Sequence, residues 1–328
     1  MIGSASKMTE AGNNGMTVGR AWIVYLSLAL TLSFYHLQTI DRPFWPDRSV
    51  FHQGIIHGGF KSPYQYRILA PWLVEIPSVI VEKVIDIAPG KSAAMVREFF
   101  YLLQRLIAVF LLFVVFHLYL KTWFNSDIAF GGTMLLAALH IFTYRSYYFQ
   151  PSSPLNLLFL TTGVYLMTRG EYKGWLYPLT FVGSLARETF GLIVPLHLSF
   201  FGLKRTTLKH TIGLFLVWVV VQAGLRVVFG MRPSFPDRPL ITNLYEVPWP
   251  IFLYALIWLI PLVGIRRLPS ELRSMLFWYA LPLLAVNAVF GKVEETRLFL
   301  DLAIVLIPAT LFVLLGSREK AGESLAAA

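Results

Sequence analysis

The sequence predicts an all-α fold: a polytopic bundle of about ten transmembrane helices, with an amphipathic juxtamembrane helix in the first extracytoplasmic loop. Three observations support this prediction. Hydrophobic residues make up 56% and charged residues 14% of the 328 residues, whereas about a quarter of a typical soluble domain is charged. The mean hydropathy is +0.62. Apolar runs of span length recur along the whole chain, so no sizeable soluble domain remains.

Composition also excludes several classes of function. The chain contains no cysteine, which excludes disulfides, cysteine-ligated zinc, iron–sulfur clusters and thiol catalysis. Its net charge of +10 comes from basic residues in the loops between apolar runs, where they set topology and contact anionic lipid. We therefore expect membrane lipids as partners and no nucleic acid.

The chain divides into one membrane domain and two tails. Residues 1–20 are rich in Gly, Ser, Asn and Met and are expected to form a disordered cytoplasmic tail. A single transmembrane domain covers 21–316 and includes a long outer loop at 38–98, and 317–328 form a second cytoplasmic tail. The first apolar run lacks a cleavage site of small residues, so it is expected to be a retained helix.

Ten apolar runs are expected to cross the membrane. They lie near 21–37, 99–120, 127–144, 154–168, 174–186, 190–203, 211–229, 250–265, 274–290 and 299–316.

Residues 67–87 have a different pattern. Glu75, Ser78, Glu82 and Asp86 share one helical face, and an apolar face lies opposite, which predicts a helix lying in the membrane interface. With this helix flat and the N-terminus inside, the basic short loops 204–210 and 266–273 become cytoplasmic, in agreement with the positive-inside rule. If 67–87 crossed the membrane, both loops would move outside.

Under this topology, three polar segments meet on the outer side and form the candidate site. The first loop supplies two carboxylates, and a carboxylate just beyond a membrane helix can be desolvated enough to act as a general base. Arg187 and Glu188 lie between two short spans, where ionisable residues need partners. The last outer loop, 291–301, is also highly charged. The candidate residues are Asp41, Asp47, His57, Tyr64, Tyr66, Arg67, Arg187, Glu188, Glu294, Glu295 and Arg297.

Each segment also has a purely structural interpretation. The first and last loops could be solvated connectors, and Arg187–Glu188 could be an internal pair that fixes helix packing. We interpret Arg105, inside the second span, as a packing or lipid-snorkelling residue. The histidines lack the spacing of metal ligands, and no metal site is predicted. Gly131 and Gly132 are expected to allow close helix contacts.

Several segments resemble glycosyltransferases of the GT-C superfamily, particularly the GPI mannosyltransferase type and related polyprenyl-phosphate-sugar transferases. The resemblance rests on DRSVF at 47–51, HGG at 57–59, SPYQYR at 62–67 and Pro71 after the first span. The polar segments RET at 187–189 and EETR at 294–297 are similar to loops that line the lipid-donor site in such families. The adjacent D-x-D or D-E pair of several branches is missing, since Asp41 and Asp47 are six residues apart.

The resemblance implies a membrane enzyme that transfers a sugar from a polyprenyl-phosphate donor to an acceptor hydroxyl on a lipid or glycan, with inversion. Asp47 is then the first choice for the general base and Asp41 the second. Arg187 and Arg297 would bind phosphate, with Arg67 and His57 as helpers. The missing acidic pair leaves open whether a divalent cation, magnesium or manganese, takes part. The site is expected to be extracytoplasmic, in a bacterial inner membrane or an endomembrane.

Two other functions stay open on the sequence alone. A multi-pass transporter or lipid flippase would use the same charges to line a pathway, with inverted repeats and ionisable residues in span centres. A non-catalytic membrane scaffold would tolerate loss of the outer carboxylates.

Overall fold

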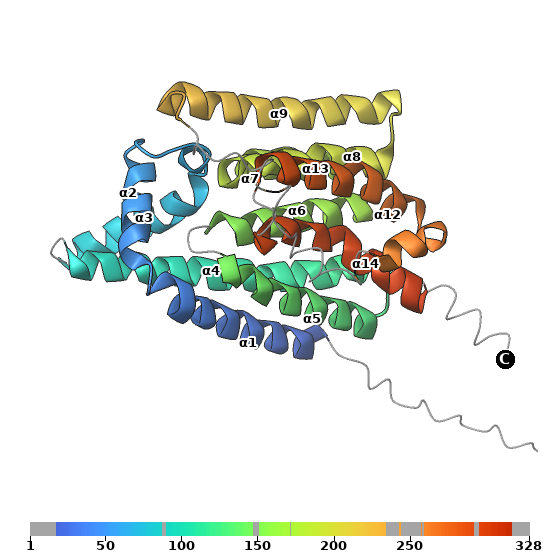
Figure 1. The fold of residues 1–328 in the computed structure, drawn as a ribbon, viewed down its shortest axis with the longest axis horizontal. Coiled ribbons are helices and arrows are strands. Elements are labelled where there is room, and N and C mark those ends of the chain that lie inside the picture. The colour runs from blue at the N-terminus through green and yellow to red at the C-terminus, as the bar shows by residue number, and fades with distance from the viewer. Residues whose placement is uncertain are drawn as a thin grey trace, which may run out of the picture.

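A computed structural model describes residues 18–86, 90–146, 151–170, 172–233, 243, 257, 259–291 and 295–316. All regular secondary structure in these ranges is helical, and they contain no β-strand. Figure 1 shows a single bundle in which successive helices run back and forth beside one another. The all-α prediction is therefore confirmed for the described part of the chain.

The helices follow the predicted apolar runs closely. The α-helices are α1 (Val18–His36), α2 (Trp45–Ile56), α3 (Leu69–Val84), α4 (Lys91–Leu120), α5 (Ser126–Phe142), α6 (Ser152–Arg169), α7 (Tyr172–Ala186), α8 (Ile193–Phe201), α9 (Arg205–Phe229), α12 (Ser270–Met275), α13 (Leu281–Phe290) and α14 (Ala303–Leu315). Short π- or 3-10 segments join or extend them: η1 (Leu37–Asp41), η2 (Tyr64–Tyr66), η3 (Thr143–Ser146), η4 (Glu188–Leu192), η5 (Ile265–Arg267), η6 (Leu276–Ala280) and η7 (Thr296–Leu302).

Five stretches of the described chain are long and apolar enough to cross a membrane, judged by length and composition. They are Gly19–Asp41, Ser92–Leu120, Arg205–Phe229, Ser270–Val289 and Arg297–Leu315. Shorter apolar helices cover Ser126–Phe142 and Glu188–Phe201. The predicted span 250–265 lies mostly outside the described residues, as do most of the first tail and all of the second. The structure thus supports several membrane-crossing helices, and the number ten is not confirmed.

Helix α6 shows why some predicted spans do not meet the criterion of length and hydropathy. It packs among α4, α7 and α8 and has little contact with the surroundings of the bundle, since Asn156 and Thr161 are fully buried. A helix enclosed by protein can carry polar side chains that lipid would not tolerate. Helices α7 and α8 have 15 and nine residues, fewer than the roughly 20 that a span needs.

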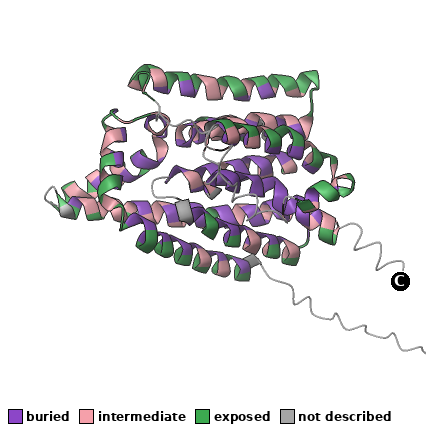
Figure 2. Ribbon diagram, in the orientation of Figure 1, coloured by how far each residue is buried: buried purple, intermediate pink, exposed green. Residues whose placement is uncertain are grey.

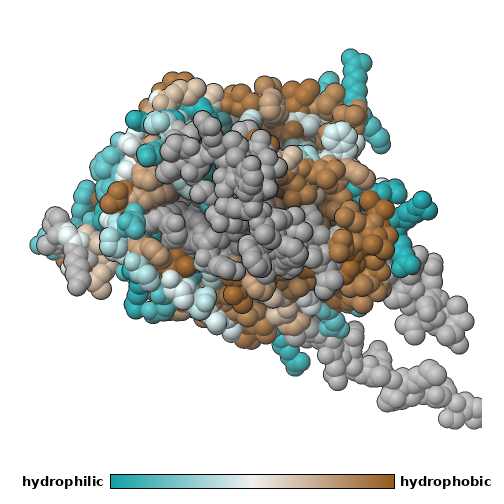
Figure 3. Space-filling view, in the orientation of Figure 1, coloured by the Kyte–Doolittle hydropathy of each residue, from teal (hydrophilic) through white to brown (hydrophobic). Residues whose placement is uncertain are grey.

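The outward faces of the long helices are strongly apolar. On α9, Val220 and Val227 are 68% and 84% exposed, and α1 presents a similar stripe. The exposed residues of α1 include Trp22, Ile23, Leu26, Leu30 and Phe34. Figure 2 shows these exposed faces, and Figure 3 shows apolar surface over the helices with hydrophilic residues gathered toward the two ends. Apolar area of this extent suits contact with lipid.

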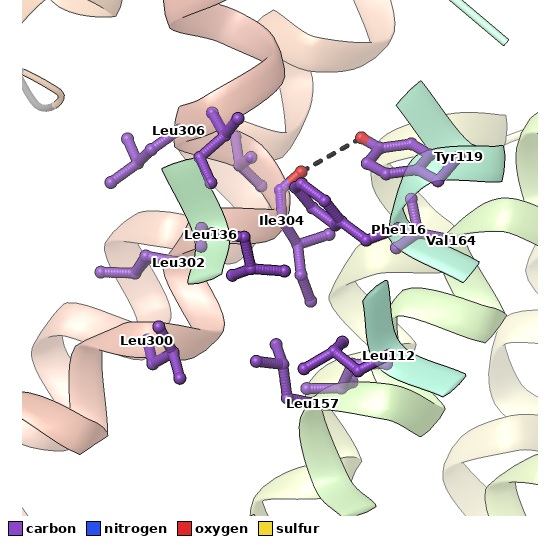
Figure 4. Packing of buried hydrophobic residues seen from close by; sticks show 14 of the residues in the cluster. Leu112, Phe116, Tyr119, Leu136, Leu157, Val164, Leu300, Leu302, Ile304 and Leu306 are labelled. Carbon is purple, nitrogen blue, oxygen red and sulfur yellow. Dashed lines mark hydrogen bonds between the residues drawn. The ribbon is translucent and has the colours of Figure 1, made fainter. Parts of the chain in front are cut away.

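The interior of the bundle is formed by α4, α5, α6 and the C-terminal segment. Figure 4 shows Leu112, Phe116 and Tyr119 of α4 packed against side chains of these elements. The Tyr119 hydroxyl donates a 3.1 Å hydrogen bond to the Ile304 carbonyl oxygen, a carbonyl near the start of α14. This contact ties the last helix to the centre of the bundle.

Helix α3 is amphipathic as predicted, but its polar face points into the protein. Ser78 is fully buried and the Glu75 side chain is 14% exposed, whereas Ile76 and Ile80 are more than half exposed. The helix packs beside the first half of α4, and α2 and α3 lie together at one end of the bundle (Figure 1), which we call the loop end. Helix α12 and the start of α1 lie toward the opposite end. A location of α3 in the membrane interface stays a prediction.

The two adjacent glycines of α5 provide a test of this packing. A Cβ added to Gly132 would lie 2.5 Å from Leu120 Cδ1 and 2.8 Å from Leu311 Cδ1, whereas one added to Gly131 meets nothing within 4 Å. We expect Gly132→Val to lower the free energy of unfolding by about 1–3 kcal/mol through overpacking. Thermal unfolding in detergent measures the effect. Gly131→Val is the matched control, and equal destabilisation by both variants would contradict the packing.

Candidate functional site

The loop end joins segments that are far apart in the sequence. The Tyr66 hydroxyl donates to the Gly230 carbonyl oxygen at 2.9 Å and accepts from the Arg232 backbone N–H at 3.0 Å. The Ser62 backbone N–H donates to the Pro233 carbonyl oxygen at 3.1 Å. Through its hydroxyl, Tyr66 therefore joins the first loop to the end of α9, and its role in substrate binding stays a prediction.

Arg67 and Glu188 form an ion pair between the first loop and the turn after α7. Arg67 Nε lies 2.8 Å from Glu188 Oε2, and Arg67 Nη2 contacts Glu188 Oε1, so the guanidinium binds both carboxylate oxygens. The Arg67 guanidinium also stacks on the Tyr64 ring at 4.9 Å. Trp218 Nε1 donates to the Glu188 carbonyl oxygen at 2.8 Å. Glu188 thus pairs with Arg67 rather than with its neighbour Arg187.

Arg187 is the buried arginine of this group without a close carboxylate. The residue is 4% exposed, and its Nη1 makes a long hydrogen bond of 3.5 Å to Ser153 Oγ. Among the described residues, no carboxylate oxygen forms an ion pair with it. Asp301 and Arg297 lie close enough for their charges to act on it. This isolation in a buried position makes Arg187 suited to an anionic ligand.

The last predicted loop brings further charged groups to the same place. Arg297 is 6% exposed and its Nη2 contacts Glu295 Oε2. Asp301 accepts a 3.0 Å hydrogen bond at Oδ2 from Asn156 Nδ2 of α6. The structure therefore places Arg297 and Glu295 with Arg187 at the loop end, and Glu294 lies outside the described residues.

Asp41 lies in a separate buried cluster. The π-helical turn η1 ends α1 and leaves Asp41 1% exposed. Its Oδ1 lies 2.6 Å from Arg48 Nη1, 3.2 Å from His36 Nδ1 and 3.7 Å from Arg105 Nη2. Arg105 is 6% exposed and its guanidinium points into the protein toward a carboxylate, which agrees with a packing role and not with snorkelling into lipid.

Asp47 and His57 are exposed at opposite ends of α2. Asp47 occupies the first turn, where a carboxylate is favourable at the positive end of the helix dipole. His57 Nε2 lies 3.0 Å from Gln53 Oε1. Neither residue is brought into contact with Arg187 by the described structure.

A hydrogen-bonded chain beside Asp41 was missed by the sequence reasoning. His52 Nδ1 lies 2.8 Å from the Tyr101 hydroxyl and Nε2 lies 2.9 Å from Glu75 Oε2. Arg97 Nε donates to the same Glu75 oxygen at 2.7 Å, and the Arg48 guanidinium lies over the Tyr101 ring at 4.7 Å. The spacing of Arg48 and His52 is the signal that could have revealed the chain, since residues i and i+4 share a helix face.

The surroundings of this chain shift two pKa values. Burial lowers the pKa of His52 below its usual 6.5, more than the hydrogen bond to Glu75 raises it. Burial alone raises the pKa of Glu75, but hydrogen bonds from Arg97 and His52 outweigh it and the net pKa falls below 4.5. At neutral pH, a neutral His52 therefore donates from Nε2 to the Glu75 carboxylate and accepts from Tyr101 at Nδ1.

The lowered pKa values predict loss of stability in acid. Both groups contribute stability above their ordinary pKa values, and that contribution falls as the pH drops below about 6.5 for His52 and below about 4.5 for Glu75. We expect the melting temperature in detergent to fall between pH 7.5 and pH 4.5. His52→Gln keeps a donor for Glu75 but cannot titrate, so its profile should be flatter. A profile parallel to that of the wild type would contradict the assignment.

The Arg67–Glu188 pair predicts strong energetic coupling. Glu188→Gln leaves a buried guanidinium without its counter-charge and should lower the free energy of unfolding by about 3 kcal/mol. Adding Arg67→Gln to Glu188→Gln should cost much less than the sum of the single variants. Denaturant unfolding of the four proteins gives the coupling energy. Additive effects would show that the two side chains do not interact.

Among the described residues, no group of three or more His, Asp or Glu side chains could hold a metal ion. Comparison of the chain with protein-family models, with curated proteins and with solved structures gave no match.

Proposed function

We propose that the protein is a GT-C-type glycosyltransferase that moves a sugar from a polyprenyl-phosphate donor to an acceptor hydroxyl on the extracytoplasmic side, with inversion. The observation that carries this proposal is Arg187, a buried guanidinium with no carboxylate in ion-pair range among the described residues. Asp301 and Glu188 act on Arg187 without forming an ion pair with it, and a buried cation that lacks a direct ion pair is costly. A phosphate that enters with the substrate would supply that charge.

The residues around Arg187 fit such a role. Arg67 holds Glu188 and thereby fixes the turn that carries Arg187. Arg297 lies near enough to add positive charge, although Glu295 already contacts it. Guanidinium groups bind phosphate oxygens through two parallel N–H donors. The departing phosphate would be stabilised by Arg187 first, with Arg297 in support.

The two aspartates receive different roles in this proposal. Asp41 is held by Arg48 and is 1% exposed, so it suits a positioning role at the end of α1. Asp47 is exposed and can accept the proton of an acceptor hydroxyl. In the reaction, Asp47 takes that proton, the hydroxyl oxygen forms a bond to the anomeric carbon, and the bond from that carbon to the phosphate oxygen breaks.

A divalent cation is not given a step in this mechanism. Glu188 and Glu295 are the carboxylates beside the candidate phosphate ligands, and an arginine already engages each of them. Carboxylate oxygens are the protein ligands that magnesium and manganese prefer. These two side chains therefore do not form an open cation site in the described arrangement.

The proposed sidedness rests on the distribution of basic residues. Lys204 immediately precedes α9 and Arg205 begins it, and Arg266 and Arg267 lie shortly before α12. Helix α12 lies at the end opposite α2 and α3 (Figure 1). By the positive-inside rule, that end faces the cytoplasm and the loop end faces outward. We also propose that about ten helices cross the membrane, and that the shorter inner helices are among them.

A transporter or lipid flippase is the second candidate. Arg105, in the middle of α4, is buried within 3.7 Å of Asp41, and ionisable residues inside spans are typical of transport pathways. Flux of a lipid-linked sugar in proteoliposomes without a covalent product would favour this candidate.

The transferase proposal is tested with Asp47→Asn, Asp41→Asn and Arg187→Ala. Loss of the general base should reduce transfer about 10²–10⁴-fold, and loss of Arg187 should reduce it about 10²–10³-fold. Asp41→Asn should lower activity together with thermal stability. Sugar transfer from a lipid-phosphate donor is measured by mass spectrometry. Asp127→Asn, an exposed change at the start of α5, is the control, and full activity in all three variants would end the assignment.

A further inference from the structure

Arg48 is a buried arginine that joins α2 to two other helices. Its side chain is 2% exposed, and it lies in the first half of α2, at the loop end (Figure 1). Arg48 Nη1 lies 2.6 Å from Asp41 Oδ1 at the end of α1. The guanidinium carbon lies 4.7 Å from the centre of the Tyr101 ring of α4. One side chain therefore connects α2 with both α1 and α4.

A second connection lies one helical turn later on α2. His52 Nδ1 lies 2.8 Å from the Tyr101 hydroxyl, and His52 Nε2 lies 2.9 Å from Glu75 Oε2 of α3. Residues four apart share a helix face, so Arg48 and His52 hold the inner face of α2 together. Tyr101 takes part in both connections, because its ring contacts Arg48 and its hydroxyl contacts His52.

The ion pairs around Arg48 join equal numbers of positive and negative side chains. They involve three arginines and three carboxylates, which are Arg48, Arg97, Arg105, Asp41, Glu75 and Glu82. Arg187 differs, since no carboxylate of the described residues forms an ion pair with it. This balance of charge around Arg48 favours a supporting role for the group and not the binding of a charged ligand.

Asp47 precedes Arg48 in the sequence and takes its position from α2. It lies in the first turn of that helix and is exposed, whereas Arg48 is buried. Successive residues of an α-helix are about 100° apart around its axis, so fixing one side chain inward also fixes the direction of the next. A displacement of about 1 Å at a reacting group can lower a rate about 100-fold.

We propose that Arg48 is a positioning residue for sugar transfer. By binding Asp41 and stacking on Tyr101, it fixes α2 so that Asp47 meets the acceptor hydroxyl. Arg48 acts through Asp47 and makes no contact with the reacting atoms. This inference rests on the proposed function, in which Asp47 is the general base.

Arg48→Lys tests the proposal in the full chain in detergent. Lysine keeps a positive charge for Asp41 but lacks the flat guanidinium that stacks on Tyr101. We expect kcat for sugar transfer to fall about 100-fold, while KM for the polyprenyl-phosphate-sugar donor changes less than about threefold. The KM stays similar because the donor phosphate is proposed to bind at Arg187. Initial rates of sugar transfer, followed by mass spectrometry, give both constants.

Two control variants separate positioning from stability. Gly132→Val should lower the melting temperature through overpacking in α5, yet leave kcat close to that of the wild type. Arg42→Lys is the matched control for the substitution itself, because the Arg42 side chain is 59% exposed in the same loop. It should change neither the melting temperature nor kcat.

A second measurement follows α2 directly and needs no enzymatic activity. The chain contains no cysteine, so Val50→Cys, at a position of α2 that is 68% exposed, gives a single attachment site for a spin label. Arg48→Lys should increase the mobility of this label in the electron paramagnetic resonance spectrum. Gly132→Val should leave the mobility unchanged.

Several outcomes would overturn the positioning role of Arg48. These are a wild-type kcat in Arg48→Lys, an equal fall of kcat in Gly132→Val, and unchanged label mobility in Arg48→Lys. If Arg48→Lys does not fold, Tyr101→Phe keeps the ring and removes the hydroxyl contact with His52, with an expected loss of kcat of about fivefold. Absence of sugar transfer by the wild type would overturn the proposed function, whereas increased label mobility would leave the anchoring of α2 by Arg48 intact.

Discussion

A guanidinium removed from water needs compensation, and this constraint organises the loop end of the protein. Arg67 pairs with Glu188, which lies 121 positions later in the sequence. Arg48 pairs with Asp41 at the end of the preceding helix. Arg97 binds Glu75 and Glu82 of α3. Each pair joins two segments that no continuous helix connects. The loops are therefore held in one arrangement by charges whose separation would leave a buried ion without a partner.

In this bundle, charged side chains face the interior and large apolar side chains face outward, the opposite of the arrangement in a soluble protein. On α3 the glutamates face the protein, and Ile76 and Ile80 face outward. On α9 the outward face is largely valine, leucine and phenylalanine. Lipid tails solvate such faces, whereas polar side chains in lipid must find partners inside the protein. Burial of charge and exposure of apolar surface therefore have the same explanation, which is that the helices lie in a bilayer.

The positions of the helices could be predicted from the sequence because apolar runs are local. The run at 127–144 became Ser126–Phe142 and the run at 154–168 became Ser152–Arg169. Partners could not be predicted in this way, because they depend on how distant helices pack. The sequence placed Arg105 in a span but did not connect it with Asp41, and it did not single out His52 or Tyr101 at all. The convergence of Arg67 and Glu188 was expected from topology, but the pairing of Glu188 with Arg67 rather than Arg187 required the structure.

Arg187 differs from the neighbouring buried arginines, because no carboxylate of the described residues forms an ion pair with it. The other buried arginines of the loop end pair with carboxylates of the same chain, so the free-energy cost of burying them is compensated when the protein folds. Within the described part of the chain, the hydrogen bond of the Arg187 guanidinium is the long one to Ser153, and we propose that a bound ligand compensates for the remaining cost of burying this charge. A ligand that binds only the folded state stabilises that state in proportion to its concentration relative to its dissociation constant. Binding at Arg187 and ordering of the turn that carries it would then be coupled, so that the donor itself completes the loop end at which the chemistry is proposed to occur.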